Sequence, residues 1–357
     1  MKAIIIGLIV LGIVIGSAVF YFWYMMKKPL YISGMIREGI NLRSPLTPPA
    51  QSTDGDFWQV EKDIKLYHYS VGKGKNIIII HGGPGSPFIE PWKDLDQLTD
   101  DYRLCYYDQR GCGKSTRPVN RFESSNYYKN VKILDQTLGL GAQIADIERI
   151  RQILGDEKII ILGHSWGGFL ASLYAAEFPE HISAMILLAP ADVLVMNSDE
   201  GGGLYDELRN KLPGNRRPEF DKFLERYFDY SNIFSMTEAE LITMNLEFND
   251  FYLAGITDTD VKLQENNKKA TGGWMVHAMY FSMGKAHDYR DVMKNVTAPV
   301  LVVHNGDDMQ PGGRTKIYAE AFPNSRLEVI EGASHFSYKQ KTDKLAALLK
   351  QFLRDNI

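Results

Sequence analysis

The sequence has very little cysteine, with two residues in a chain of 357. Cys105 falls in an apolar run and Cys112 in the turn that follows, so a bond between them would be too local to hold a fold together. We interpret both as small buried residues. This scarcity excludes a disulfide framework and is compatible with an oxidising or a reducing compartment.

An excess of positive charge is also absent. Lysine and arginine number 40 against 44 aspartates and glutamates, which gives a net charge of -4, so we expect no nucleic acid partner. The hydrophobic fraction of 45% and the charged fraction of 24% are ordinary for a globular protein. The length fits one large α/β unit that carries an insertion.

Charged side chains are missing between Ala3 and Met26. A helix over these residues would span about 36 Å at about 1.5 Å per residue, enough to cross a bilayer. We therefore predict that residues 1–28 form a single-pass membrane anchor, with the domain that follows outside the cytoplasm. A cleaved signal peptide is the alternative, with small residues at 16–18 as its cleavage site, but the aromatic run at 20–24 does not fit such a site.

Proline and turn-forming residues dominate residues 29–56, which we predict to be a stalk. Beyond this stretch, apolar runs alternate with helical patterns, which indicates a mostly parallel sheet flanked by helices. Between residues 191 and 295 the strand pattern stops and aromatic-rich helical stretches replace it. We expect an α/β core formed by residues 57–190 and 296–357, with residues 191–295 inserted late in the chain as a helical cap.

A Gly-x-Ser-x-Gly motif occupies residues 163–167, directly after the aliphatic run 159–162. A buried strand followed at once by a helix predicts a nucleophile elbow, a sharp turn that exposes Ser165. Side chains at Gly163 and Gly167 would collide where the strand and the helix cross. The alternative is a glycine-rich turn with an incidental serine.

A serine hydroxyl needs a base and a carboxylate to become a nucleophile, in the chain order serine, acid, histidine. The apolar run 299–305 ends in a turn that holds Asp307 and Asp308, and a later loop carries His335. We assign His335 as the base. Adjacent residues leaving a strand point in opposite directions, so one aspartate can face it. We prefer Asp308 and keep Asp307 as the alternative.

A second glycine-rich loop, residues 81–86, follows the apolar run 76–80. In this architecture such a loop supplies one N–H of the oxyanion hole, and the residue after the nucleophile supplies the other. We assign these donors to Gly83 and Trp166. A phosphate-binding loop is the competing interpretation, but no Gly-Lys-Ser or Gly-Lys-Thr follows the loop.

Three blocks, His81–Ser86, Tyr107–Ser115 and Gly163–Gly168, together resemble the prolyl iminopeptidase branch of the α/β-hydrolase superfamily. The resemblance extends over roughly residues 57–357. It implies that the turn at residues 108–111 braces the oxyanion loop. It also implies these roles: Ser165 as nucleophile, Asp308 as acid, His335 as base, and Gly83 and Trp166 as oxyanion donors.

The resemblance implies a serine peptidase that removes proline from the N-terminus of short peptides through an acyl-enzyme, with no metal or organic cofactor. The family binds the substrate amine through glutamates of the cap, for which Glu238, Glu240, Glu247 and Asp250 are candidates. An esterase, lactonase or amide hydrolase with the same machinery is the first alternative. A membrane-tethered binding protein without turnover is the second. The oligomeric state is left open.

Overall fold

The computed structural model describes residues 28–53, 55–196, 203–256 and 270–357. Within these residues, eight strands form one sheet of order β1-β2-β4-β3-β5-β6-β9-β10. Their bounds are β1 (Phe57–Glu61), β2 (Ile64–Gly72), β3 (Lys75–Ile80), β4 (Tyr102–Tyr107), β5 (Ile159–His164), β6 (Ile182–Leu188), β9 (Val300–Asn305) and β10 (Ser325–Ile330).

The sheet is antiparallel at one edge and parallel elsewhere. β1 and β2 form an antiparallel hairpin, and β2 pairs antiparallel with β4. From β4 through β3, β5, β6 and β9 to β10 every pairing is parallel. Parallel strands are buried on both faces, which explains the unbroken aliphatic runs that identified them in the sequence. The predicted mostly parallel sheet is therefore confirmed.

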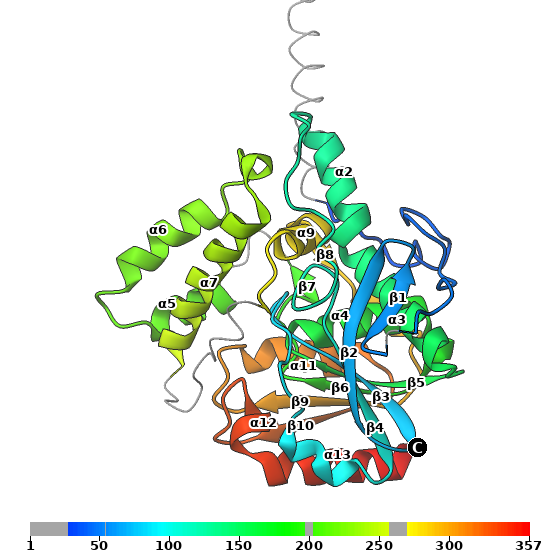
Figure 1. Ribbon diagram of the computed structural model, residues 1–357. Coiled ribbons are helices and arrows are strands. Elements are labelled where there is room, and N and C mark those ends of the chain that lie inside the picture. Colours follow the sequence, from blue (N-terminus) through cyan, green and yellow to red (C-terminus); the bar gives the residue numbers. More distant parts are fainter. Residues whose placement is uncertain (1–27, 54, 197–202, 257–269) are drawn as a thin grey trace, which may run out of the picture.

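Helices cover both faces of the sheet (Figure 1). Ile78 and Ile80 of β3 belong to the larger core with α2, α3 and α4, whereas Ile77 and Ile79 face η1 and α13. This alternation follows from the period of two along a strand. The bounds are η1 (Lys93–Leu98), α2 (Tyr127–Leu138), α3 (Leu140–Leu154), α4 (Trp166–Glu177), η2 (Pro179–His181), α10 (Arg290–Met293), α11 (Gly312–Ala321), α12 (Ser337–Gln340) and α13 (Thr342–Asn356).

Between β6 and β9 the chain leaves the sheet. It forms α5 (Leu204–Lys211), α6 (Arg217–Tyr227), η3 (Ile233–Ser235), α7 (Glu238–Gly255) and α9 (Trp274–Met283), with a two-residue ladder of β7 (Val195–Met196) and β8 (His287–Asp288). In Figure 1, α5, α6 and α7 stand apart to the left of the sheet. The helix α9 instead packs against α2 and α3. We call α5, α6 and α7 the cap below.

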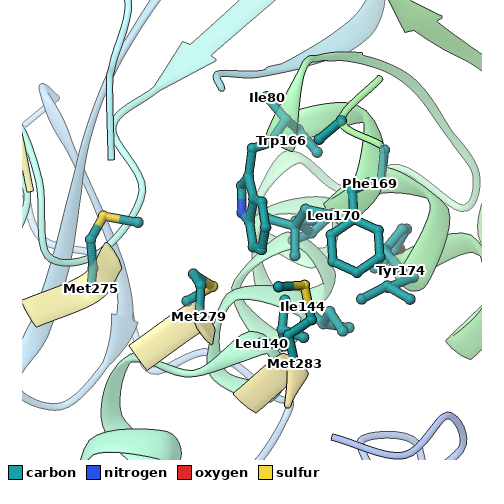
Figure 2. Packing of buried hydrophobic residues seen from close by; sticks show 14 of the residues in the cluster. Ile80, Leu140, Ile144, Trp166, Phe169, Leu170, Tyr174, Met275, Met279 and Met283 are labelled. Atoms are coloured by element: carbon teal, nitrogen blue, oxygen red, sulfur yellow. The ribbon is translucent and has the colours of Figure 1, made fainter. Parts of the chain in front are cut away.

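A stripe of methionines joins α9 to the helix that begins at the elbow. Met275, Met279 and Met283 recur every four residues, so they share one face of α9. Figure 2 shows this stripe directed toward Trp166 and Phe169 of α4. All five side chains are buried. The return of the chain from the cap is therefore packed against the helix that carries the elbow.

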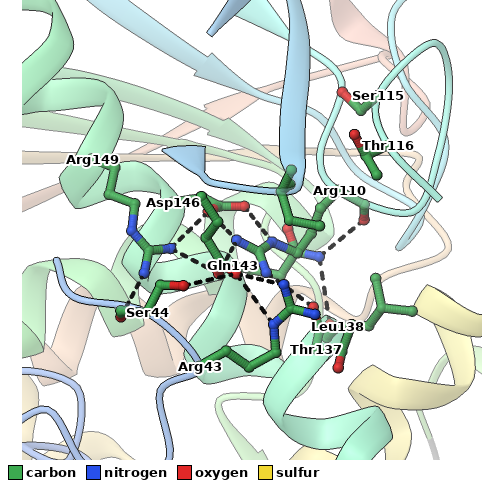
Figure 3. Close-up of polar contacts among 12 residues, drawn as sticks. Arg43, Ser44, Arg110, Ser115, Thr116, Thr137, Leu138, Gln143, Asp146 and Arg149 are labelled. Carbon is green, nitrogen blue, oxygen red and sulfur yellow. Dashed lines mark hydrogen bonds and ion pairs between the residues drawn. The ribbon is translucent and has the colours of Figure 1, made fainter. Parts of the chain in front are cut away.

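A buried ionic network ties the turn after β4 to the N-terminal part of the chain (Figure 3). Arg110 donates to Asp146 at 2.6 Å and to Glu61 at 2.8 Å, and Arg149 donates to Glu61 at 3.2 Å. Arg149 also donates to the carbonyl of Ser44 at 2.9 Å. Buried charges are tolerated when they are paired and hydrogen-bonded, as they are here.

The segment 29–56, which we predicted to be a stalk, lies against the core over its described residues. Tyr31 and Ile36 are buried, and Glu177 at the end of α4 accepts from the Tyr31 hydroxyl at 2.8 Å and the Gly34 N–H at 2.7 Å. Composition alone did not reveal this packing, because it depends on contacts with distant residues such as Glu177 and Arg149.

The predicted membrane anchor is corrected. Among the described residues no helix is long and apolar enough to cross a membrane. The run Ala3–Met26 on which we based the anchor lies in residues 1–27, outside the described residues. The transmembrane helix, the membrane partner and the single-pass localisation with an extracytoplasmic domain are therefore withdrawn. Hydropathy and length had suggested a span, and no helix within the part of the chain that the structure describes meets both requirements.

Candidate active site

Ser165 occupies the sharp turn between β5 and α4. Its backbone has φ 55° and ψ −122°, a conformation that a residue with a side chain rarely adopts. A Cβ at Gly163 would lie 2.3 Å from the Gly167 carbonyl oxygen, and a Cβ at Gly167 would lie 2.1 Å from the Ile80 carbonyl oxygen. The predicted collision at both glycines is confirmed. The motif thus forms a strained strand-to-helix turn with the serine at its tip.

The structure brings His335 and Asp308 together. Nδ1 of His335 lies 3.0 Å and 2.9 Å from the two carboxylate oxygens of Asp308, both side chains being almost fully buried. A carboxylate only accepts, so Nδ1 carries a proton, which leaves Nε2 as an acceptor when the ring is neutral. Asp307 is exposed and contributes its N–H to the Ala333 carbonyl. The geometry therefore selects Asp308 over Asp307 as the partner of His335.

The carboxyl of Asp308 is held ionised. Burial alone would raise its pKa, but the charge and hydrogen bond of His335 and the Gln310 N–H at 2.9 Å outweigh burial, and the pKa is lowered. An ionised carboxylate next to Nδ1 stabilises an imidazolium when the ring takes up a proton. The pair is therefore suited to general-base chemistry.

Ser165 and His335 line one cavity of about 780 Å³. Its volume is that of a site for a small organic molecule or a short peptide end. Aromatic rings from the core form one wall, where Trp92 and Tyr338 stack with centroids 4.0 Å apart. Tyr280 of α9 also contributes to the lining.

The two predicted oxyanion donors also border this cavity. Gly83 and Trp166 are among its lining residues, and neither backbone N–H donates a hydrogen bond within the described chain. Gly82, which the sequence reasoning did not single out, approaches Ser165 closely: a Cβ at position 82 would lie 2.9 Å from the Ser165 Cβ. The run of glycines in residues 81–86 could have indicated that the backbone of this loop must approach Ser165 closely.

The turn after β4 braces the oxyanion loop, as the resemblance implied. The Gln109 N–H donates to Nε2 of His81 at 3.1 Å, and the Gln109 side chain donates to the His81 carbonyl at 2.8 Å. Burial lowers the pKa of His81 to about 4, so the ring is neutral and can accept this bond. Arg110, the next residue, anchors the turn in the buried ionic network.

His164 positions the loop that carries His335. Its Nε2 donates to the His335 carbonyl at 2.9 Å. Burial, together with the neighbouring charge of His335, lowers the pKa of His164 to about 3, which keeps its ring neutral. Sequence reasoning treated this residue as the variable position of the elbow motif, and no local signal points to a bond across 171 residues.

The four cap-region acids proposed for amine recognition do not line the described cavity. Glu238 binds Arg117 at 2.6 Å and the backbone N–H groups of Gly273 and Trp274 at 3.1 Å and 2.6 Å. It therefore connects the start of α7 to the start of α9. Of the remaining three acids, two make local contacts and one is exposed: Glu240 caps α7, Glu247 pairs with Arg226, and Asp250 faces solvent.

Comparison with known proteins identifies the family. The alpha/beta hydrolase fold family matches residues 75–342. The chain belongs to this family. A proline iminopeptidase of Lactobacillus acidophilus is 27% identical to this hydrolase over 293 residues, which cover 78% of this chain and 90% of that one. The resemblance inferred from the three sequence blocks is therefore confirmed.

Solved structures agree on the fold of the hydrolase. A proline iminopeptidase of Mycobacterium smegmatis has a TM-score of 0.54 at 19% identity, covering 83% of this chain and 96% of that chain. An esterase of Thermogutta terrifontis has a TM-score of 0.53 at 20% identity, covering 82% and 94%. Likeness at these identities supports the fold and leaves the substrate to be argued from the site.

Proposed function

We propose that this hydrolase is a serine peptidase of the proline iminopeptidase type, with Ser165 as nucleophile, His335 as base and Asp308 as acid. The observation that carries the proposal is the pairing of Asp308 with Nδ1 of His335 beside a cavity that also contains the strained Ser165. The substrate class rests on the relatives named proline iminopeptidase.

In the proposed reaction, Nε2 of His335 takes the Ser165 proton as Oγ attacks the carbonyl carbon of the scissile bond. The negative charge that develops on the carbonyl oxygen is stabilised by the N–H groups of Gly83 and Trp166. Collapse of the tetrahedral intermediate transfers the proton from His335 to the leaving amine and leaves an ester on Ser165. Water, deprotonated by His335, then hydrolyses that ester and frees the acid and the serine.

A fluorophosphonate probe tests the nucleophile. We expect the full-length protein to be labelled at one serine, and Ser165→Ala to abolish labelling and to lower turnover by several orders of magnitude. Ser172→Ala provides a matched control, because Ser172 lies in α4, the helix that follows Ser165, and its hydroxyl donates to the Gly168 carbonyl. Labelling that persists in Ser165→Ala would refute the assignment.

Substrate class is tested on the same preparation with proline β-naphthylamide and p-nitrophenyl butyrate. A peptidase of the proposed type hydrolyses the amide. The wide cavity with its aromatic wall is the observation that favours an esterase instead. Hydrolysis of the ester alone would establish that second candidate, and labelling of Ser165 without turnover on either substrate would favour a binding protein.

A further inference from the structure

The cavity carries its own carboxylates, and they differ in exposure. Among the described lining residues these are Glu90, Asp192 and Asp206. Glu90 and Asp206 are exposed, whereas Asp192 is half-buried. Exposed carboxylates are screened by water and salt, so an ion pair with one of them contributes little. Asp192 is therefore the carboxylate best able to hold a cationic group inside the cavity.

Asp192 is held close to the reacting groups by hydrogen bonds on both sides. Its chain neighbour Ala191 donates its N–H to the Ser165 carbonyl at 3.0 Å. The Asp192 N–H donates to the side chain of Gln310 at 3.2 Å, and the Gln310 N–H donates to Asp308 at 2.9 Å. Asp192 is thus linked to the Ser165 backbone through Ala191 and to Asp308 through Gln310.

This position suits the amine of an N-terminal residue. In any α-amino acyl group the nitrogen is two bonds, or about 2.5 Å, from the carbonyl carbon that the serine attacks. An acid that recognises this nitrogen must therefore lie near the nucleophile itself. The loop after β6 meets this requirement, whereas Glu238, Glu240, Glu247 and Asp250 of the cap region lie outside the cavity lining.

The Asp192 carboxylate also has capacity for a further donor. The Leu204 N–H at the start of α5 donates to it at 3.1 Å, and an ionised carboxylate accepts about four hydrogen bonds. Arg314, which also lines the cavity, acts on Asp192 through its charge, but no arginine, lysine or histidine of the described residues lies within ion-pair distance of the carboxylate. Burial raises the pKa of Asp192, and the Leu204 N–H and the charge of Arg314 offset this effect only in part.

Tyr252 supplies a second polar group in the same cavity. Its hydroxyl is buried and has no hydrogen-bond partner among the described residues, and its ring lies edge-on to His335 with centroids 6.0 Å apart. A buried hydroxyl without a hydrogen-bond partner is unfavourable, and a ligand that forms a hydrogen bond with it removes this cost. The secondary ammonium of an N-terminal proline has two N–H donors, one for Asp192 and one for Tyr252.

We propose that Asp192, on the core loop after β6, binds the N-terminal ammonium of the substrate, and that Tyr252 accepts its second N–H. This inference rests on the proposed peptidase function. It makes the hydrolase specific for short peptides with a free, cationic N-terminus. It also assigns amine recognition to the core, next to the nucleophile, and leaves Glu238 to hold α7 and α9 together.

The test compares Asp192→Asn with the parent protein on two substrates of similar shape: proline β-naphthylamide and p-nitrophenyl cyclopentanecarboxylate, whose ring has no nitrogen. We expect kcat/KM to fall about 100-fold on the proline substrate, because a charge-assisted hydrogen bond is lost, and by less than about threefold on the ester. The asparagine oxygen can still accept from the Leu204 N–H, so the unfolding temperature should be unchanged.

Asp206→Asn is measured in parallel because Asp206 is the acid that α5 of the cap contributes to the same cavity. Equal losses of Asp192→Asn on both substrates, no loss on either, or a selective loss in Asp206→Asn would each overturn the assignment of Asp192. These outcomes leave the peptidase proposal intact as long as the parent protein hydrolyses proline β-naphthylamide. A parent protein inactive on that amide would overturn the peptidase proposal itself.

Discussion

At the scale of single residues, the site depends on positions where one atom more would not fit. A Cβ added at Gly82 would lie only 2.9 Å from the Ser165 Cβ. The absence of side chains at Gly163 and Gly167 allows β5, α4 and β3 to approach one another. These contacts hold Ser165 in a left-handed backbone conformation that it would not adopt alone. The surrounding packing maintains this strained conformation, which places the Ser165 hydroxyl at the cavity.

Asp308→Asn is expected to lower kcat about 10⁴-fold, because an amide beside Nδ1 stabilises the wrong imidazole tautomer. Asp307→Asn is the matched control, with the same substitution one residue earlier on an exposed side chain, and should change kcat less than about twofold. Steady-state kinetics on p-nitrophenyl butyrate measures both. Similar losses in the two variants would contradict the assignment of Asp308.

At the scale of secondary-structure elements, polar contacts connect the cap and the chain that returns from it to the core. Arg117, in the loop before α2, donates to Glu238 at the start of α7 and to the carbonyls of Ala270 and Thr271 at 3.1 Å and 3.0 Å. The Gly272 N–H then donates to the Gly85 carbonyl of the oxyanion loop at 2.9 Å. The return from the cap is thus hydrogen-bonded to a loop that lines the cavity.

Glu238→Gln should destabilise the protein by about 3 kcal/mol, because it leaves the partly buried Arg117 without its charged partner. Glu240→Gln on the same helical turn is the control. Its side chain is exposed and a glutamine can complete the same capping box, so we expect a change below about 0.5 kcal/mol. Urea denaturation gives both values. Equal losses would show that Glu238 does not connect the two helices.

At the scale of the whole molecule, three buried neutral histidines link stability to pH. Burial is the leading cause that lowers the pKa of His81 and His277 to about 4 and that of His164 to about 3. The unfolded chain takes up protons at about pH 6.5, so it binds more protons than the native state below this pH. The native state is therefore not penalised by these three histidines above about pH 7, and it loses stability through them as the pH falls toward 4.

We expect the free energy of unfolding to fall by about 3 kcal/mol between about pH 7 and pH 5.5. The three histidines account for about 4 kcal/mol, and Asp108, whose pKa burial raises to about 6, offsets about 1 kcal/mol. Urea denaturation at several pH values measures the slope. His277→Leu should reduce the histidine contribution by about one third, because its ring nitrogens have no partner among the described residues. An unchanged slope in this variant would refute the linkage.

Much of the fold and of the candidate site could be predicted because the signals are local. Four consecutive aliphatic residues before Gly163 identify a buried strand, and the glycines around Ser165 show that a helix follows at once. The order of Ser165, the aspartate pair and His335 follows from connectivity alone. For Ala3–Met26 the same local reasoning suggested a membrane span. That run lies outside the described residues, among which no helix is long and apolar enough to cross a membrane.

The sequence by itself determined the strand-turn-helix framework, the elbow and the family, because each depends on residues within one turn or strand. Only the tertiary structure paired His335 with Asp308 and not Asp307, revealed the structural contacts of Glu238 and placed Asp192 in the lining of the same cavity as Ser165. These outcomes depend on hydrogen bonds between side chains and backbone groups that folding brings together from distant positions. Local sequence patterns carry no information about which distant group forms a hydrogen bond with a buried carboxylate.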